Sequence, residues 1–235
     1  MLKLNRLLLL LLMVVGTGTA NAGVIIGGSA LLSDGNVSQL EAWLGEGPLT
    51  LTNIFTKGVG STSYNFHTAA DGRGRTFAVM QATNNSTGQT GLIGGYDPQS
   101  WDSSGQFHTS SDYNAFIFNL TTVVKNIQGD YDCPDCGQSQ TFNTGFYGPT
   151  FGKGFDIVIT RSLNGGYLYP FSYSQEGGPN LLGSSGISAI TIAGLEVFTI
   201  ANGVASVPEP GTLTLLGLGV LGLAAARRRK GLTVA

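Results

Sequence analysis

The sequence predicts a mainly β protein with a few short helices (α+β), built as two antiparallel sheets packed face to face, with a separate hydrophobic helix at each end. Three observations support this prediction. Short segments with strand-like composition recur through the middle of the chain, between turns rich in Gly, Asn, Asp and Ser. One segment before them has the apolar spacing of an amphipathic helix. Both chain ends carry apolar runs flanked by basic residues.

The first 22 residues have the three parts of a secretory signal peptide. These parts are a basic start at Lys3 and Arg6, an apolar run over 7–15, and the small residues Ala20 and Ala22 before Gly23. This pattern predicts export through the inner membrane and cleavage by signal peptidase, so that the mature chain begins near Gly23. The alternative is an uncleaved N-terminal anchor, but so short an apolar run is a poor permanent span.

A short amphipathic helix is predicted over residues 36–44. Its apolar face consists of Val37, Leu40, Trp43 and Leu44. Ser38 and Glu41 have the spacing of a capping box, and Asn36 is an alternative N-cap. Gly45 is placed to end the helix, because glycine is the usual residue after a helix C-terminus.

Strand patterns dominate the rest of residues 23–206, which we interpret as one domain. The predicted strands are Thr50–Phe55, Arg75–Gln81, Gly91–Tyr96, Ala115–Leu120, Phe155–Ile159, Ser188–Ile192 and Leu195–Ile200. Turn pairs such as Asp71-Gly72 and Asn84-Asn85 lie between them. Many short strands with few helices indicate two antiparallel sheets sharing a core.

The two cysteines, Cys133 and Cys136, are separated by two residues. In an oxidising compartment a local disulfide is the expected state, although so small a loop adds little stability. One alternative is a thioredoxin-like redox pair, but the flanking sequence has the composition of a loop, not of a strand and a helix. Another is a cation site formed by Asp130, Asp132 and Asp135, which lacks the full calcium-loop pattern. We predict no bound metal and no cofactor.

The C-terminal 29 residues, 207–235, form a distinct segment. It consists of Val207, Pro208, Glu209 and Pro210, an apolar run over 211–226, and the basic cluster Arg227, Arg228, Arg229 and Lys230. The prolines keep the first part extended. The apolar run predicts a transmembrane helix of about 24 Å, with the arginines on the cytoplasmic side. A match to G-x-G-x-x-G within 217–222 lacks the strand and the acidic residue of a dinucleotide site, so we interpret these glycines as part of a membrane helix.

This order of a Pro-Glu-Pro motif, a helix, arginines and the chain end resembles the PEP-CTERM signal of Gram-negative bacteria. The resemblance implies an exosortase-type membrane protease as partner, with cleavage near Glu209. It also implies transfer to the cell surface or to the extracellular polymer. Until it is cleaved, the protein is held in the inner membrane. The alternative is a plain tail anchor that is never removed.

Removal of both ends leaves six basic and thirteen acidic residues, a net charge of −7. This charge argues against binding to nucleic acid and to anionic membrane surfaces. The chain has no G-x-S-x-G, H-E-x-x-H or P-loop motif. Four aspartates are available for acid–base work, but spacing alone cannot pair them: Asp71, Asp97, Asp102 and Asp112. We therefore predict that the protein is not an enzyme.

Four blocks in the mature chain resemble the TLDc domain family, from about Leu31 to Ile200. They are Tyr64–His67 with Asp71–Thr76; Ile93–Tyr96 with Trp101, Ser103–Gly105 and Asn114–Leu120; Gly148–Ile157; and Ile192–Phe198. The resemblance implies a β-sandwich of TLDc type. The residues that it singles out, which we expect to be mostly structural, are Phe66, His67, Asp71, Gly72, Gly94, Gly95, Tyr96, Trp101, Phe116, Gly152, Gly154, Asp156 and Glu196.

The chain also departs from this family, since Ala70 replaces a frequent cysteine and 125–144 is a local elaboration. Eukaryotic members are intracellular, act in oxidative-stress resistance and in some cases bind the V-ATPase, a partner that does not transfer simply to a bacterial surface. Three functions follow. The first is a non-catalytic surface or matrix module that contacts polysaccharide or surface proteins, with the loop 97–114, including Trp101 and His108, as its contact surface. The second is a carbohydrate-acting enzyme, which requires two close carboxyls in a cleft. The third is a protective factor in oxidative stress.

Overall fold

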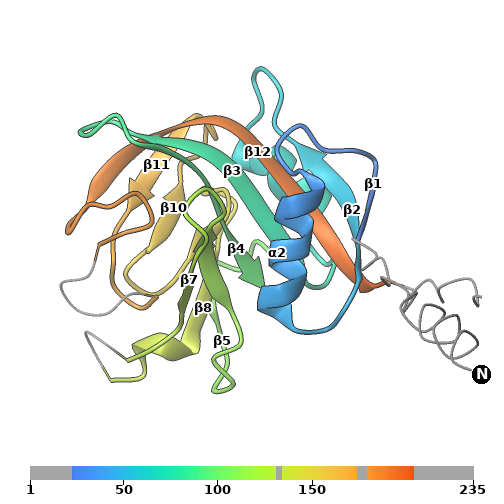
Figure 1. Ribbon diagram of the computed structural model, residues 1–235. Coiled ribbons are helices and arrows are strands. Elements are labelled where there is room, and N and C mark those ends of the chain that lie inside the picture. The colour runs from blue at the N-terminus through green and yellow to red at the C-terminus, as the bar shows by residue number, and fades with distance from the viewer. Residues whose placement is uncertain (1–22, 131–133, 174–178, 204–235) are drawn as a thin grey trace, which may run out of the picture. The chain divides into compact units, whose positions relative to one another are not determined.

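Twelve strands account for most of the fold in the computed structural model, which describes residues 23–130, 134–173 and 179–203 (Figure 1). The strands are β1 (Val24–Ile26), β2 (Leu49–Thr56), β3 (Thr76–Asn84), β4 (Thr90–Asp97), β5 (Gln106–Thr109), β6 (Phe116–Asn119), β7 (Val124–Ile127), β8 (Ser139–Asn143), β9 (Thr150–Phe151), β10 (Ile157–Ile159), β11 (Gly165–Leu168) and β12 (Ser188–Asn202). They form one hydrogen-bonded path, β5-β8-β9-β10-β11-β12-β3-β4-β6-β7, with β2 paired to β12 and β1 to β2. The β1–β2 pairing is parallel and the other pairings are antiparallel, which confirms the prediction of a mainly antiparallel β fold.

The longest strand, β12, joins the two halves of the sheet. The sequence predicted two strands here, because Ala193-Gly194 interrupts the strand pattern. The structure instead has one strand of 15 residues, with a register shift between Ile192 and Gly194 on its β3 side. A bulge of this kind absorbs the extra residue and bends the strand. Its first part pairs with β11 and its last part pairs with β2.

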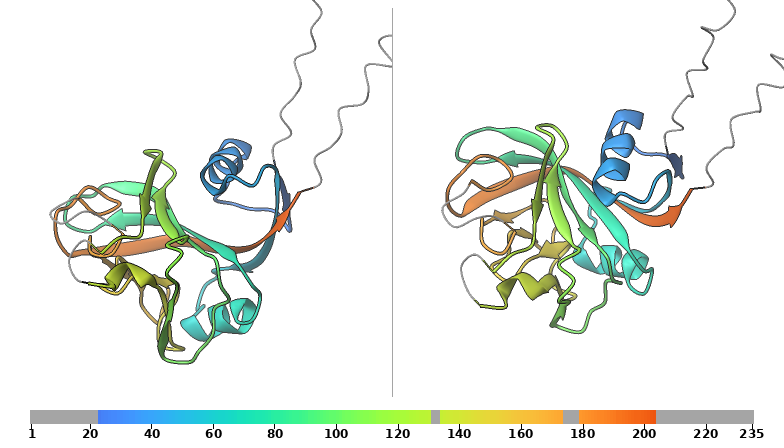
Figure 2. Two further views of the ribbon diagram at one scale, coloured as in Figure 1. Left: turned by 90° about the horizontal axis from the view of Figure 1, so that it is seen from below. Right: turned by 60° about the horizontal axis from the view of Figure 1, so that its bottom comes forward.

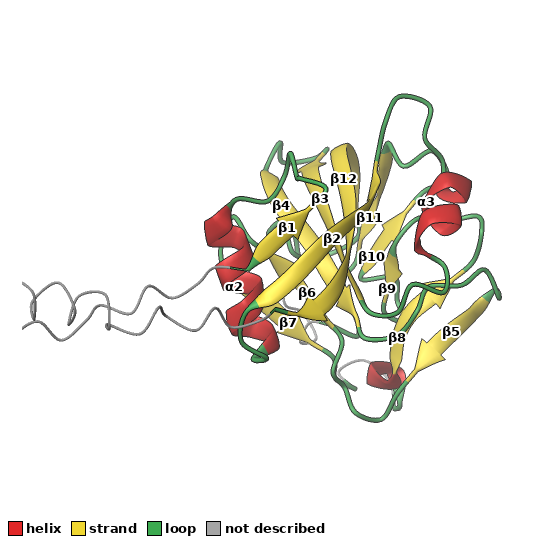
Figure 3. Cartoon of the chain, turned by 90° about the vertical axis from the view of Figure 1, so that its right-hand side faces the viewer, coloured by secondary structure: helices red, strands yellow, loops and turns green. Residues whose placement is uncertain are grey.

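The sheet carries a hydrophobic core on each of its faces, because β3 and its neighbours are buried on both sides. Phe77 and Val79 of β3 belong to one core, whereas Ala78 and Met80 belong to the other. Residues from β9, β10 and β11 pack in the second core, so this end of the sheet folds over the β3–β4 face. The two predicted layers are therefore present as parts of one continuously hydrogen-bonded sheet. Figure 3 shows β8–β11 curving away from β3, β4 and β6.

Two α-helices, α2 (Asp34–Leu44) and α3 (Ser63–Ala70), cover opposite sides of this sheet (Figure 2). Val37 and Leu40 of α2 are buried in the first core, and Phe66 of α3 is buried in the second. Helix α2 begins earlier than predicted, because its N-cap is Ser33 and its capping-box partner is Asn36. The predicted end at Gly45 is confirmed by a left-handed φ of 76°.

Several predictions concern residues outside the described ranges. These are the signal peptide (1–22, with Ala20 and Ala22), Cys133, and the sorting segment with its apolar run, 211–226. They stay predictions. Within residues 23–130, 134–173 and 179–203, none of the helices is long and apolar enough to cross a membrane.

Candidate functional site

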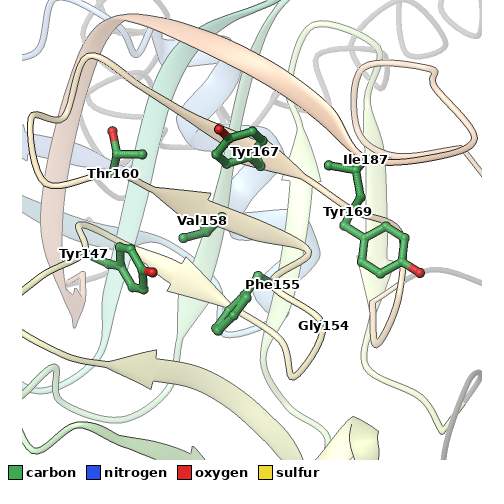
Figure 4. A pocket seen from close by; sticks show the side chains of 8 residues that line it. All are labelled: Tyr147, Gly154, Phe155, Val158, Thr160, Tyr167, Tyr169 and Ile187. Atoms are coloured by element: carbon green, nitrogen blue, oxygen red, sulfur yellow. The ribbon is translucent and has the colours of Figure 1, made fainter.

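A groove with aromatic walls lies on the outer face of β10 and β11 (Figure 4). Its volume is about 440 Å³, and it is lined by Tyr147, Gly154, Phe155, Val158, Thr160, Tyr167, Tyr169 and Ile187. We call it the aromatic groove. Strand alternation creates it: Ile157 and Ile159 point into the core, so Val158 between them faces outward, directly opposite Tyr167 of β11. Figure 4 shows the rings of the lining residues arranged around Val158.

The loops before and after these strands complete the walls. Phe155 has a φ of 62° and closes the turn that begins at Gly152, which places its ring at the end of the groove. Its ring lies 6.3 Å from Tyr147 and 5.5 Å from Phe142, between centroids. Tyr167 and Ile187 remain 48% and 69% exposed. A monomeric protein rarely leaves such side chains together on its surface unless they bind something.

His67 lies on α3 and connects that helix to the groove. Its Nδ1 is 2.6 Å from Asp71 Oδ1, and its Nε2 is 3.0 Å from the carbonyl oxygen of Tyr147. A carbonyl can only accept, so Nε2 is a protonated donor. Ser103 Oγ donates to Asp71 Oδ2 at 2.9 Å, whereas the two ring nitrogens of His67 contact Asp71 and Tyr147. The arrangement therefore positions Tyr147 and lacks the base–nucleophile contact that covalent catalysis needs.

A cavity of about 330 Å³ lies beside His67, Asp71 and Ser103. It is lined by Tyr64, His67, Thr68, Asp71, Ser103 and Gly145. Asp71 is its one lining carboxylate, so this cavity does not supply the pair of carboxyls that glycoside hydrolysis requires.

Asp97, Asp102 and His108, which all belong to the segment 97–114, form a second polar cluster. Asp97 is fully buried, and burial raises its pKa to about 6 against a single backbone hydrogen bond from Gln99 N at 3.0 Å. Its Oδ2 has no partner among the described residues, and neither has His108 Nδ1. For Asp102, burial opposes ionisation, but hydrogen bonds from Ser104 and His108 outweigh it and lower the pKa. Because Asp97 is fully buried, it cannot reach a substrate as a general acid.

Models of two known protein families match the sequence of this chain. A model described as the TLDc domain matches residues 25–201, and one described as the PEP-CTERM protein-sorting motif matches residues 206–230. The chain belongs to the TLDc domain family. The sorting motif indicates an exported protein that an exosortase sorts to the cell surface. The comparison with curated proteins returned no match.

Most residues that the sequence assigned to the TLDc pattern lie in the core. Trp101 is fully buried, and its Nε1 donates to Thr76 Oγ1 at 2.8 Å. It cannot serve as the exposed contact that we predicted for the loop 97–114, part of which is strand β5. Phe66 packs edge-on against it at 5.3 Å, and Gly72 N donates to its carbonyl oxygen. Tyr96 and Phe116 pack against each other in the other core.

The glycines of the TLDc pattern make room for neighbouring groups. A Cβ on Gly94 would lie 2.1 Å from Ala78 O, and one on Gly95 would lie 2.5 Å from the Phe151 ring. The rings that pack against these glycines are those of Phe118 and Phe151.

Gly152 has a positive φ, at 81°. Gly154 does not have a positive φ. Glycine is needed there because Phe171 packs against it, and a Cβ would lie 2.3 Å from the ring.

Two buried carboxylates of the pattern hold loops by hydrogen bonds. Asp156 accepts from Phe171 N, Ser172 N, Ser172 Oγ and Tyr173 N at 2.8–3.0 Å. Glu196 accepts from Ala30 N at 2.8 Å and from Ser29 Oγ, which holds the segment before α2. These contacts agree with the structural roles expected from the sequence.

Asp130 holds the segment before Cys136 in place by hydrogen bonds. Asp130 accepts from Gly137 N at 2.7 Å and from the Tyr113 hydroxyl at 2.8 Å, and Cys136 is buried. Among the described residues, no three His, Cys, Asp or Glu side chains converge as metal ligands. The Cys133–Cys136 disulfide stays a prediction.

The aromatic groove was not predicted from the sequence. Its tyrosines are spread over residues 147–169 and are brought together by the β10–β11 register and the loops beside these strands. A usable signal was present in Gly165-Gly166-Tyr167-Leu168-Tyr169, where large rings alternate with small or apolar residues.

Proposed function

We propose that the mature protein is a non-catalytic binding protein of the cell surface or the extracellular polymer, and that its aromatic groove holds a neutral polysaccharide. Signal peptidase and an exosortase-type protease deliver it there. The aromatic groove on a chain with a surface-sorting motif is the observation that carries this proposal.

The chemistry of the lining suits an uncharged sugar. The faces of aromatic rings carry partial negative charge and attract the weakly positive C–H faces of a pyranose ring. Tyr147, Tyr167 and Tyr169 add hydroxyl groups, which can donate to or accept from sugar hydroxyls. Among the residues that the structure describes, no Asp, Glu, Lys or Arg lines the groove, so these residues offer no ion pair to an acidic or basic polymer.

The hydrogen bonding and the burial of the polar residues support the proposal of a non-catalytic protein. His67 has both ring nitrogens engaged by acceptors, and the raised-pKa carboxyl of Asp97 is buried. The described part of the aromatic groove's lining contains no carboxylate. A carbohydrate-acting enzyme would need two carboxyls that face the same bond.

The groove predicts a specific loss of glycan binding. Replacing Tyr167 or Tyr169 with alanine should weaken retention by a neutral polysaccharide about tenfold, since one stacked ring contributes on the order of 1.4 kcal/mol. Affinity electrophoresis in gels that contain neutral glucan or the purified extracellular polymer measures this. Tyr64→Ala is the matched control, because Tyr64 is 72% exposed and does not line the groove.

Equal retention of all three variants would contradict the proposal. Release of new reducing ends from the polymer would instead favour the carbohydrate-acting enzyme.

The sorting motif predicts two cleavages. The intact mass of protein recovered from the medium or cell surface should correspond to a chain from Gly23 to about Pro208. Replacing Pro208 and Pro210 with alanine should leave an uncleaved C-terminus in the membrane fraction, whereas Thr233→Ala, outside the matched residues 206–230, should be processed normally. A wild-type protein that keeps its full C-terminus in the membrane would favour a permanent anchor.

A further inference from the structure

Gly23, the first described residue, is held tightly between α2 and β2. A Cβ at this position would lie 2.3 Å from Glu41 Oε1, 2.5 Å from Leu49 O and 3.0 Å from Val37 Cγ1. Its φ is outside the left-handed region, so the requirement for glycine is one of space and not of backbone conformation. The same Glu41 Oε1 accepts from Leu49 N at 2.7 Å, which fixes the carboxylate against the start of β2.

Cleavage before Gly23 would change the charge at this position. The peptide N–H of Gly23 becomes an ammonium group with three donors and a positive charge. The nitrogen and the position of that Cβ are both bonded to the Gly23 Cα, so the nitrogen lies close to the same two acceptor oxygens, Glu41 Oε1 and Leu49 O. Among the described residues around Gly23, Glu41 is the group that can carry the opposite charge.

We propose that the folded domain contains a built-in seat for its own mature N-terminus, in which the Gly23 ammonium pairs with Glu41 and donates to Leu49 O. This rests on the proposed export and signal-peptide cleavage. The seat lies directly before β1, a three-residue edge strand that pairs only with β2 among the described strands. Cleavage would therefore add a charge-assisted anchor where the sheet is otherwise held by few hydrogen bonds.

The seat also explains why the chain continues with glycine after the cleavage site. The small residues Ala20 and Ala22 satisfy the protease, whose requirement ends at the cleaved bond. The requirement at residue 23 comes instead from the fold, because any side chain would meet the backbone oxygen of Leu49.

The test uses the exported protein as recovered from cells, with its N-terminal peptide followed by mass spectrometry. We expect a chain that begins at Gly23, whose α-amine reacts with an amine-selective reagent about tenfold more slowly in the folded protein than in urea, because a paired ammonium releases its proton less readily. Glu41→Gln should abolish most of this protection, since the amide can still accept from Leu49 N but carries no charge. Glu46→Gln is the matched control, because Glu46 lies just after the same helix and pairs with Arg75.

Each other outcome has a separate meaning. A Gly23 terminus that reacts equally in the folded and unfolded protein would overturn the seat while leaving the proposed function intact. A mature chain that begins at another residue would also overturn it. A chain that retains Met1 would contradict the export on which both proposals rest.

Discussion

Replacing Asp156 with alanine is expected to lower the free energy of unfolding by about 4 kcal/mol, because it leaves several buried donors without an acceptor. The carboxylate accepts three backbone N–H groups and the Ser172 hydroxyl, and it joins the start of β10 to the segment 171–173. Burial raises the pKa of Asp156 and these hydrogen bonds oppose the rise, so part of their energy offsets the loss of hydration.

Urea unfolding followed by tryptophan fluorescence measures this loss, because Trp101 is fully buried in the core. Asp156→Asn should cost about half as much, since one amide oxygen still accepts but the amide nitrogen faces donors. The exposed Asp112 provides a control, and Asp112→Ala should change stability by less than about 0.5 kcal/mol. A loss at position 156 no larger than at position 112 would show that water satisfies these donors equally well.

Asp156→Ala should also weaken glycan retention. Asp156 follows the groove residue Phe155 directly, and its carbonyl oxygen accepts from Tyr169 N at 3.3 Å. The loop that the carboxylate holds includes Phe171, whose ring stacks on Tyr169 at 5.7 Å. Stability and binding are therefore linked through one residue of the TLDc pattern.

Local sequence patterns identified the long, regular elements and the short strands β6 and β10, and missed other short elements. The strand patterns around β2, β3 and β4 are strong because apolar or β-branched residues recur along strands of eight or nine residues. Helix α3 was not predicted, since Ser63–Ala70 is only eight residues long and mostly small or polar. Short strands such as β5 and β7 are polar or exposed, and only their neighbours in the sheet define them.

The structural roles of single residues were easier to predict than their partners. Asp156 and Glu196 were expected to specify the fold, but their hydrogen-bond donors lie 15–17 and 166–167 residues away in the chain. The ring beside Gly95 is that of Phe151, which comes from the folded-over end of the sheet and not from a segment near in sequence. Contacts between distant segments depend on register, which one sequence does not reveal.

Substitution of Asp97 is expected to raise the free energy of unfolding at neutral pH, whereas substitution of Asp156 is expected to lower it. The Asp97 carboxylate is fully buried with one backbone donor, and burial raises its pKa from 3.8 to about 6. The folded state therefore binds the proton more tightly than the unfolded chain does. Stability falls as the pH rises from about 4 to about 6, and the full penalty is present above that range.

Asp97→Asn should therefore stabilise the protein at pH 7.5 by about 3 kcal/mol, the energy equivalent of this pKa difference. The amide oxygen keeps the bond from Gln99 N, and the change removes the buried charge while an amide N–H₂ replaces the unpartnered Oδ2. At pH 4 the two proteins should unfold at nearly the same urea concentration, because the wild-type carboxyl is then protonated in the folded state.

Asp102→Asn supplies the control with the opposite sign. Its folded-state pKa is lowered, so its contribution is favourable above the unfolded pKa and is lost as the pH falls through the folded one. The substitution should slightly destabilise the protein at pH 7.5 by weakening the contact with His108. If Asp97→Asn were also destabilising at pH 7.5, the buried carboxylate would have to be stabilised by a partner beyond Gln99.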